Sequence, residues 1–554
     1  MLRDAIATLV RDAAAAAQRA GEIPAVTLPE VLIERPQRPE NGDYATTLPM
    51  RLRRAVGGST KPLDLAEAIA RHVDAPELLR EVVVAPPGFI NFFVDDGWLQ
   101  RQVEEIVQAG PAFGTNASGA GQRVQVEFVS ANPVGPLHVG NGRGAVTGST
   151  LAAILEANGY SVEREYYVND AGTQTDTFGR TLYARYQQQF GRDVPVPEDG
   201  YPGEYMVELA RQIKDECGDR FLDAPGEPAP PELKELGIER MIESIRADVG
   251  ALGVHYDRFF SERSLFTDHT YEKTMALLRE RGHVTEKEGA VWFTAPQLGQ
   301  DRDNVLVRSG GSPTYFASDI AYHYDKCVLR GFDRVIDIWG ADHQGHVARM
   351  KTAVDALGID PERLTILLYQ LVTLKRGQQV VRLSKRSGDI ITMREVVDEV
   401  GADACRFFFL MRSPDSAMDF DLELAKEQSN ENPVYYVQYA HARIAGILRK
   451  AAEEGVDYAA GDVALLTHPA ELALIRTMLR YPELLSDAAA RLEAHGLPYY
   501  AKQLAQDFHV FYTECRVVSE DAALSQARLK LVKAAQTVLA NVLRLMGMSA
   551  PERM

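Results

Sequence analysis

Cysteine is scarce in this sequence, and its spacing suits neither a metal site nor a disulfide framework. The 554 residues include four cysteines, none of them in a Cys-x-x-Cys pair: Cys217, Cys327, Cys405 and Cys515. Structural zinc sites need closely spaced thiolates or histidines, and disulfide-stabilised folds need many cysteines. We therefore expect buried free thiols and no structural metal bound by the protein.

Long hydrophobic runs are also missing. No stretch approaches the roughly 20 apolar residues that a membrane-spanning helix requires. The first residues, MLRDAIATLVRDAAAAAQRA, mix acids and arginines with apolar residues, which predicts an amphipathic helix over about 2–20. They lack the apolar core and cleavage site of a secretion signal. A cytoplasmic location is the expectation.

Positive charge is in deficit. The chain has 60 Lys and Arg against 78 Asp and Glu, a formal net charge of −18. This balance by itself argues against a nucleic-acid partner. Binding a phosphate backbone requires only a local basic stripe, however, so composition leaves the class of partner open. The motifs have to decide it.

The most informative stretch is VQVEFVSANPVGPLHVGNGRG, residues 124–144. It begins as a strand, breaks into a turn rich in Asn, Pro and Gly, and continues as helix-compatible sequence from about Gly140. His138 lies in the turn. The free N–H groups and the dipole of a helix N-terminus favour a phosphate there, and Gly140 lets a ligand approach the backbone.

The segments that follow predict a parallel sheet. A second strand is expected at 161–170, a third at 334–340 and a fourth at 364–374, with helical sequence between them. A polar turn follows at 378–389 and helices at 393–411. A strand–helix–strand order implies a right-handed crossover, with ligands at the carboxyl ends of the strands.

Three domains are expected from the length and from these patterns. Residues 1–108 predict a small α+β module with a helix near 62–73 and strand-like sequence at 81–94; a Gly-rich linker follows at 109–122. Residues 120–430 predict the α/β domain, with an inserted subdomain at about 178–300. Residues 432–554 are helical throughout, with helices over 434–452, 469–492 and 527–548, which predicts an all-α bundle.

Two short segments together resemble a known family. ANPVGPLHVGN (131–141) resembles the HIGH signature of class I aminoacyl-tRNA synthetases in the arginyl-tRNA synthetase version, and RLSKRSG (382–388) resembles the KMSKS loop. Asn141 stands where the second His is usual, and Arg382 and Arg386 replace a Lys and a Ser. The order of the two signatures makes the pair far more specific than either alone.

Further segments carry the same resemblance over nearly the whole chain. GDYAT and PPGFINFFV resemble the N-terminal extension of that family, and NDAGTQ, YPGEY and the final SAPERM also match. The resemblance implies a Rossmann-like catalytic domain, an N-terminal module that contacts the tRNA elbow and a C-terminal anticodon-binding domain.

The activity implied is that of an arginine–tRNA ligase. Arginine and ATP, with Mg²⁺, give arginyl-adenylate and pyrophosphate, and the arginine then passes to the 3′-terminal ribose of tRNA(Arg). No covalent enzyme nucleophile is needed, because positioning and electrostatic stabilisation carry such a reaction. His138 is expected to donate to phosphate oxygens and Lys385 to neutralise the pyrophosphate. A monomer without an editing site fits the resemblance.

Arginine recognition requires carboxylates, because a guanidinium presents a planar fork that carboxylate oxygens match. Glu127 lies on the first strand, and Asp319 lies four residues after Tyr315, on the same face of a helix. The resemblance implies arginine-binding residues Glu127, Ser130, Asn132, Tyr315, Asp319 and His343, with Asn132 on the α-ammonium or carboxylate. It implies catalytic residues His138, Asn141, Ser384 and Lys385. It implies ATP-binding residues Pro136, Gly140, Gly340, Asp342, His343, Arg382 and Leu383.

Other interpretations remain open. The chain fits another HIGH-type adenylate-forming enzyme, such as a cysteinyl synthetase or a small-molecule ligase. The lack of a zinc-binding Cys/His set argues against the first, and the helical C-terminal region argues against the second. A synthetase-like RNA-binding protein without catalysis is a third possibility, which the retained His138, Gly140, Ser384 and Lys385 oppose. His343 and His346 suggest a metal pair, but no third ligand stands out.

Overall fold

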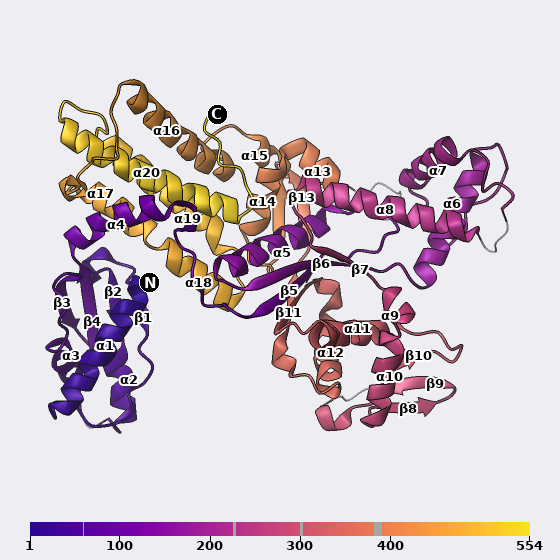
Figure 1. Ribbon diagram of the computed structural model, residues 1–554, viewed down its shortest axis with the longest axis horizontal. Helices are drawn as coiled ribbons and strands as arrows, with labels where there is room; N and C mark the ends of the chain where they lie inside the picture. The colour runs from indigo at the N-terminus through magenta and orange to yellow at the C-terminus, as the bar shows by residue number, and fades with distance from the viewer. Residues whose placement is uncertain (59, 225–228, 300–302, 382–390) are drawn as a thin grey trace.

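A five-stranded parallel sheet lies at the centre of the computed structural model, which describes all residues except 59, 225–228, 300–302 and 382–390 (Figure 1). The strands are β5 (Arg123–Phe128), β6 (Ser161–Val168), β7 (Arg258–Ser261), β11 (Arg334–Gly340) and β12 (Leu364–Tyr369). Their spatial order is β12-β11-β5-β6-β7, and every neighbouring pair is parallel. The strand order reverses between β5 and β11. Ligands bind outside the carboxyl ends of the strands at such a reversal.

The two faces of β5 bury different chemistry. Val124, Val126 and Phe128 enter the largest apolar core, which includes helix α5 (Val139–Ala157). That helix lies close to the strand because Gly148 faces Phe128: a Cβ at Gly148 would lie 2.2 Å from the phenyl Cγ. The opposite face of β5 points toward α11 (Tyr315–Tyr324) and carries the buried polar residue Glu127.

The expected insert at about 178–300 is wrong as one continuous unit, because β7 lies within it and joins the central sheet. Before β7, α6 (Thr173–Gln188), α7 (Glu204–Cys217) and α8 (Pro231–Ala251) enclose a small core of their own, and α6 and α7 project from one end of the molecule (Figure 1). After β7, the chain forms α9 (Ser264–Thr267), α10 (Thr270–Glu280) and an antiparallel sheet of β8 (Val284–Lys287), β9 (Ala290–Phe293) and β10 (Asn304–Val307). These pack with α11 and α12 (Gln344–Ala356) in a second core.

The single strand expected at 364–374 is wrong in extent. It is two strands in different sheets, β12 and β13 (Val372–Arg376). Between them, Gln370 N donates to Pro414 O (2.8 Å), which turns the chain out of the central sheet. β13 joins β14 (Gln379–Val380) and β15 (Met418–Asp421), and the helices alongside are α13 (Met393–Val400), α14 (Ala402–Leu410) and α15 (Leu422–Lys426).

The N-terminal module is a four-stranded sheet in the order β1-β2-β4-β3, packed on helices. Its elements are α1 (Leu2–Arg19), β1 (Ile33–Glu34), β2 (Tyr44–Thr46), α2 (Leu48–Ala55), α3 (Pro62–Ala70), β3 (Leu79–Ala85), β4 (Phe89–Val94) and α4 (Asp96–Ala109). The amphipathic opening helix is confirmed, with Ile6 and Val10 buried. The strand-like stretch at 81–94 is a hairpin, β3–β4, because the chain reverses at Pro86–Gly88.

The C-terminal region is a bundle of helices, as predicted. Its members are α16 (Pro433–Glu453), α17 (Pro469–Met478), α18 (Tyr481–Arg491), α19 (Gly496–Glu514) and α20 (Ala522–Leu545). The helix expected over 469–492 is two helices, and Pro482 starts the second, since proline lacks the N–H that would continue the first. The bundle holds the N-terminal module through Glu483, which accepts from Arg35 Nε (2.9 Å) and Tyr44 Oη (2.5 Å). None of the described helices has the length and apolar content that a membrane span requires.

Candidate active site

The His138 turn lies at the carboxyl end of β5 and starts α5. His138 is the N-cap residue: its Nδ1 accepts from Gly140 N (3.1 Å), while Asn141 Oδ1 accepts from His138 N (3.1 Å). Asn141, in the place of the usual second His, thus fixes the turn from within. Because Nδ1 is an acceptor, a neutral His138 ring carries its proton on Nε2. The turn therefore presents a donor beside the positive end of a helix dipole.

The chain that follows 382–390 is attached to this turn, and the chain that precedes it is attached to β13. Arg382, Leu383, Ser384 and Lys385 lie outside the described residues. After them, Met393 N donates to Leu137 O (2.8 Å), and Thr392 forms a β-bridge with His138. Before them, Val381 N donates to Leu374 O (2.9 Å), which extends the β13–β14 pairing. The fold therefore brings the chain that follows the second signature to the first signature, across about half of the sequence.

The ends of β11 and β12 complete this edge of the sheet. Gly340 pairs with Tyr369, and a Cβ at Gly144 of α5 would lie 2.9 Å from the Tyr369 ring, so the first signature and Gly340 meet at this tyrosine. Burial raises the pKa of Tyr369 to about 12. Asp342 and His343 follow Gly340 and are exposed, with His343 Nε2 3.6 Å from Asp342 Oδ2. Pro136 and Gly140 are half-buried in the turn itself.

No metal cluster occurs among the residues that the structure describes: none of them form a group of three or more His, Cys, Asp and Glu side chains able to hold an ion. The rings of His343 and His346 lie 5.6 Å apart, centroid to centroid.

Both carboxylate oxygens of Glu127 accept hydrogen bonds from other side chains of the protein. Its Oε2 accepts from Lys326 Nζ (2.5 Å) and its Oε1 from Ser130 Oγ (2.8 Å). The turn after β5 is unusual, because Val129 and Ser130 have φ values of 72° and 43°, a conformation that costs a β-branched residue energy. The strained turn aims the Ser130 hydroxyl back at Glu127, and Tyr167 N donates to that hydroxyl (3.1 Å).

Lys326 is fully buried in a π-helical turn, Asp325–Leu329, and bridges two strands. Its ammonium donates to Glu127 on β5 and to Asp337 Oδ1 (2.8 Å) on β11, which are register partners. Burial would lower the pKa of Lys326, but Asp337 and Glu127 raise it. Burial opposes ionisation of Asp337, yet Lys326 and His323 hold its pKa at about 2. The cluster is an internal ion network behind the site.

A second pair of carboxylates lies on the open side of this network. Asp319 is in α11, as expected, and is close enough to repel Glu262, which directly follows β7 and is 4% exposed. Burial, with repulsion from Glu127 and Asp337, raises the pKa of Asp319 to about 6, despite His323 and Lys326. Burial, with repulsion from Asp319 and Asp170, raises the pKa of Glu262 to about 7. A cation bound beside these two acids would favour the ionised form of both.

Polar side chains surround these two acids. The Asn169 side-chain amide is oriented so that its nitrogen and oxygen both have hydrogen-bond partners, and in this orientation the nitrogen donates to Glu262 Oε2 (2.6 Å). Asn132 Nδ2 donates to Gln174 Oε1 (2.5 Å). Tyr315, one turn before Asp319, is 42% exposed at the edge of α11. Sequence reasoning missed Glu262, whose only signal is its position after a strand that was not expected.

Comparison with known proteins decides the family. The chain matches the models described as arginyl tRNA synthetase N terminal domain (residues 3–94), tRNA synthetases class I (R), catalytic domain (102–198 and 239–441) and DALR anticodon binding domain (437–554). It is 55% identical over 538 residues to an arginine–tRNA ligase of Dehalococcoides mccartyi, covering 97% of this chain and 96% of the relative. The chain belongs to the arginyl-tRNA synthetase family.

Two other members agree over the full length. The identity to an arginine–tRNA ligase of Heliobacterium modesticaldum is 48% over 560 residues, covering 100% of this chain and 99% of the relative. The crystal structure of Thermus thermophilus arginyl-tRNA synthetase superposes with a TM-score of 0.77 at 25% identity, covering 100% of both chains. The family expected from the two signatures, the class I parallel sheet and the helical C-terminal domain are confirmed.

Proposed function

We propose that the carboxyl edge of the central sheet activates arginine with ATP, and that the acidic pair Asp319 and Glu262 selects the amino acid. Membership of the family makes the chain an arginine–tRNA ligase, whose reaction has two steps, adenylate formation and transfer to tRNA. The residues that perform these steps are assigned below from the geometry.

The acidic pair Asp319 and Glu262 is assigned to the guanidinium. Glu262 is buried and Asp319 is half-buried, and these neighbouring carboxylates repel each other. A planar monocation with several N–H donors relieves such repulsion while bonding to both acids. The observation that carries the assignment is the buried Glu262, which accepts from Asn169, beside Asp319 of α11, and the raised pKa values of both acids agree with it. Asn132 is assigned to the α-ammonium or carboxylate, and Tyr315 and His343 to the rim. Glu127, already bonded to Lys326 and Ser130, is assigned to the wall of the pocket and not to the fork.

The His138 turn and the Gly340 edge are assigned to ATP. His138 Nε2–H and the start of α5 face the phosphates, Pro136 and Gly140 leave room for the nucleotide, and Asp342 and His343 border it. Mg²⁺ arrives with ATP as part of the substrate. The arginine carboxylate attacks the α-phosphorus and pyrophosphate leaves. Lys385, with Ser384, Arg382 and Leu383, is proposed to stabilise the leaving group from the segment attached at Thr392.

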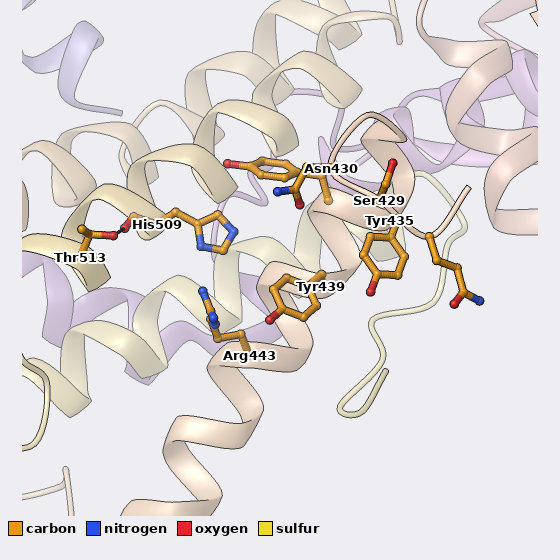
Figure 2. Close-up of a pocket in the computed structure, with 9 residues that line it drawn as sticks. Ser429, Asn430, Tyr435, Tyr439, Arg443, His509 and Thr513 are labelled. Atoms are coloured by element: carbon orange, nitrogen blue, oxygen red, sulfur yellow. Dashed lines mark hydrogen bonds between the residues drawn. The ribbon is translucent and has the colours of Figure 1, made fainter. Parts of the chain in front are cut away.

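An aromatic cavity in the helical domain is assigned to the tRNA anticodon. It has a volume of about 670 Å³ and opens between α16 and α19, where the rings of Tyr435, Tyr439 and His509 and the Arg443 side chain line a shared space (Figure 2). Arg443 Cζ lies 5.2 Å from the Tyr439 ring centroid. Aromatic rings and arginine planes stack on unpaired bases, as in single-stranded RNA recognition.

The anticodon assignment predicts a tRNA-specific defect. Tyr439→Ala should raise the KM for tRNA about tenfold, since one stacked base contributes about 1–3 kcal/mol. The KM for arginine should not change. Tyr499→Ala, which removes an exposed ring outside the cavity, is the control. An unchanged KM for tRNA in Tyr439→Ala contradicts the assignment.

The arginine pocket is tested by removing one charge at a time. Glu262→Gln and Asp319→Asn should each raise the KM for arginine in ATP–pyrophosphate exchange by at least tenfold, with kcat much less affected. Glu163→Gln removes a half-buried acid elsewhere on the sheet, 3.1 Å from Arg330, and should leave the KM unchanged. Equal effects in Glu163→Gln, or none in Glu262→Gln, overturn the assignment.

We also propose that the protein works as a monomer in the cytoplasm. Its substrates, ATP, arginine and tRNA, are cytoplasmic. Light scattering at the working concentration measures the oligomeric state. A stable dimer whose specific activity exceeds that of the dilute protein contradicts the monomer.

A further inference from the structure

Arg143, in the second turn of α5, is a buried arginine held by backbone carbonyls. Its side chain is fully buried, and its guanidinium donates to Gln370 O (2.9 Å), Ser416 O (2.8 Å) and Ser413 O (2.8 Å). Among the described residues no carboxylate lies within 4.0 Å of it, and Nε has no partner. Burial lowers its pKa to about 10. Burying a charged side chain without a partner of opposite charge costs free energy.

The three carbonyls belong to two loops that carry one small sheet. Gln370 is in the loop between β12 and β13, and Ser413 and Ser416 are in the loop between α14 and β15. The loops are also bonded to each other, since Gln370 N donates to Pro414 O (2.8 Å). β13 pairs with β15 on one side and with β14 on the other. Arg143 thus fixes the β13–β14–β15 sheet to helix α5.

Helix α5 is also the helix that His138 caps. The small sheet's last strand before 382–390, β14, ends at Val380 (the departing end). After 390, Thr392 (the returning end) forms a β-bridge with His138. The returning end is therefore fixed to the His138 turn by Met393 N and Leu137 O. The departing end has no such bond among the described residues of the turn. Besides the apolar packing of β13 against α5, its link to α5 is the set of hydrogen bonds from Arg143 to the two loops.

We propose that Arg143 is a positioning residue for adenylate formation, which sets the β13–β14–β15 sheet, and hence the departing end at Val380, relative to His138. A rigid fork that reaches three carbonyls in two loops defines a relative orientation, which a flexible ammonium or an apolar side chain does not. The inference rests on the family's activity and on the proposed ATP site at His138, and not on the proposed arginine-binding acids, since Asp319 and Glu262 lie on other elements.

Arg406 supplies a matched control. It is also buried, at 2% exposure, its pKa is also lowered to about 10 by burial, and it too donates to backbone carbonyls, those of Met546 and Leu252. It joins α14 to the ends of α8 and α20, and its guanidinium also donates to Ser149 Oγ (3.0 Å) and Thr150 Oγ1 (3.3 Å) in the second half of α5, but it bonds to neither loop of the small sheet. Arg406→Lys therefore imposes a comparable loss of packing and hydrogen bonds without disturbing the loops at 370 and 413–416.

The experiment compares Arg143→Lys with Arg406→Lys in the full-length enzyme. We measure the melting temperature and, per folded molecule, kcat and the KM for arginine in ATP–pyrophosphate exchange. Both variants should melt lower. Arg143→Lys should lose at least tenfold in kcat with the KM for arginine within twofold, whereas Arg406→Lys should keep kcat within twofold. Equal kcat in the two variants at similar stability reduces Arg143 to a structural role and overturns the proposal.

A second variant covers failure of Arg143→Lys to fold. Pro414→Gly leaves Arg143 in place but loosens the loop that it holds, because glycine widens the conformational range of the chain. It should lower kcat by at least twofold and leave the KM for arginine unchanged. Unchanged kcat in folded Pro414→Gly contradicts the proposal, whatever the behaviour of Arg143→Lys.

Discussion

His138 and Asn141 each bond to the backbone at the other end of the same helical turn. The histidine Nδ1 accepts from Gly140 N, and the asparagine Oδ1 accepts from His138 N, both at 3.1 Å. Each side chain therefore satisfies a donor that the first turn of a helix leaves open. Asn141 explains how the turn is kept without a second histidine.

Two variants of Asn141 separate this cap from the charge of the site. Asn141→Ala removes the acceptor and should lower the free energy of unfolding by about 1 kcal/mol. Its kcat for ATP–pyrophosphate exchange should fall, because His138 is no longer held. Asn141→Asp keeps the acceptor oxygen and most of the stability, but places a negative charge beside the proposed phosphate site, so the KM for ATP should rise. Chemical denaturation and exchange kinetics measure both. A normal KM for ATP in Asn141→Asp contradicts the proposed ATP site.

Arginine binding should strengthen with pH. The pKa of Asp319 is about 6 and that of Glu262 about 7, so at low pH these carboxyls are protonated when no arginine is bound. Binding the guanidinium requires both acids to be ionised. The KM for arginine should fall as pH rises from about 5.5 to about 8 and then level. Glu262→Gln should remove the upper part of this dependence. A KM that is flat or rises over this range contradicts the acidic pair.

The same pKa values set the sign of the stability change. Folded carboxyls with raised pKa values bind more protons than unfolded ones, so without arginine the free energy of unfolding should fall as pH rises from about 4.5 to about 7. Saturating arginine should reduce this fall, because it favours the ionised acids. Thermal melts with and without arginine across this range measure it, and Glu262→Gln is the control.

The His138 turn could be predicted because its information is local. Alternating apolar residues at Val124, Val126 and Phe128 define the strand, and Asn-Pro-Gly residues define the turn. The spacing of Tyr315 and Asp319 likewise places both on one helix, α11. Local periodicity and turn chemistry carry such features whatever the rest of the chain does.

Glu262 and the state of Glu127 could not be predicted, because both depend on long-range packing. Glu262 reaches the pocket only because β7 pairs with β6, some ninety residues earlier in the chain. Glu127 reads from sequence as a free acid at a strand end, but Lys326 comes to it from a π-helical turn nearly 200 residues later. At the break between β12 and β13, Gln370 N likewise bonds to a residue far along the chain, Pro414.

Lys326 should be essential for stability. Lys326→Met leaves Glu127 and Asp337 buried without their cation and should lower the free energy of unfolding by about 3–5 kcal/mol. Adding Glu127→Gln to Lys326→Met should recover part of the loss, because it removes one of the two unpaired acids. Urea denaturation measures all three proteins. A Lys326→Met variant as stable as the parent contradicts the ion network.

Arginine-dependent ATP–pyrophosphate exchange, run against the other amino acids and with or without tRNA, tests the central claim most directly. The account predicts exchange with arginine and with none of the other amino acids, and it predicts that His138→Ala loses this exchange. Exchange with another amino acid would keep the class I fold and contradict the selection of a guanidinium by Asp319 and Glu262. Exchange that survives in His138→Ala would contradict the catalytic turn.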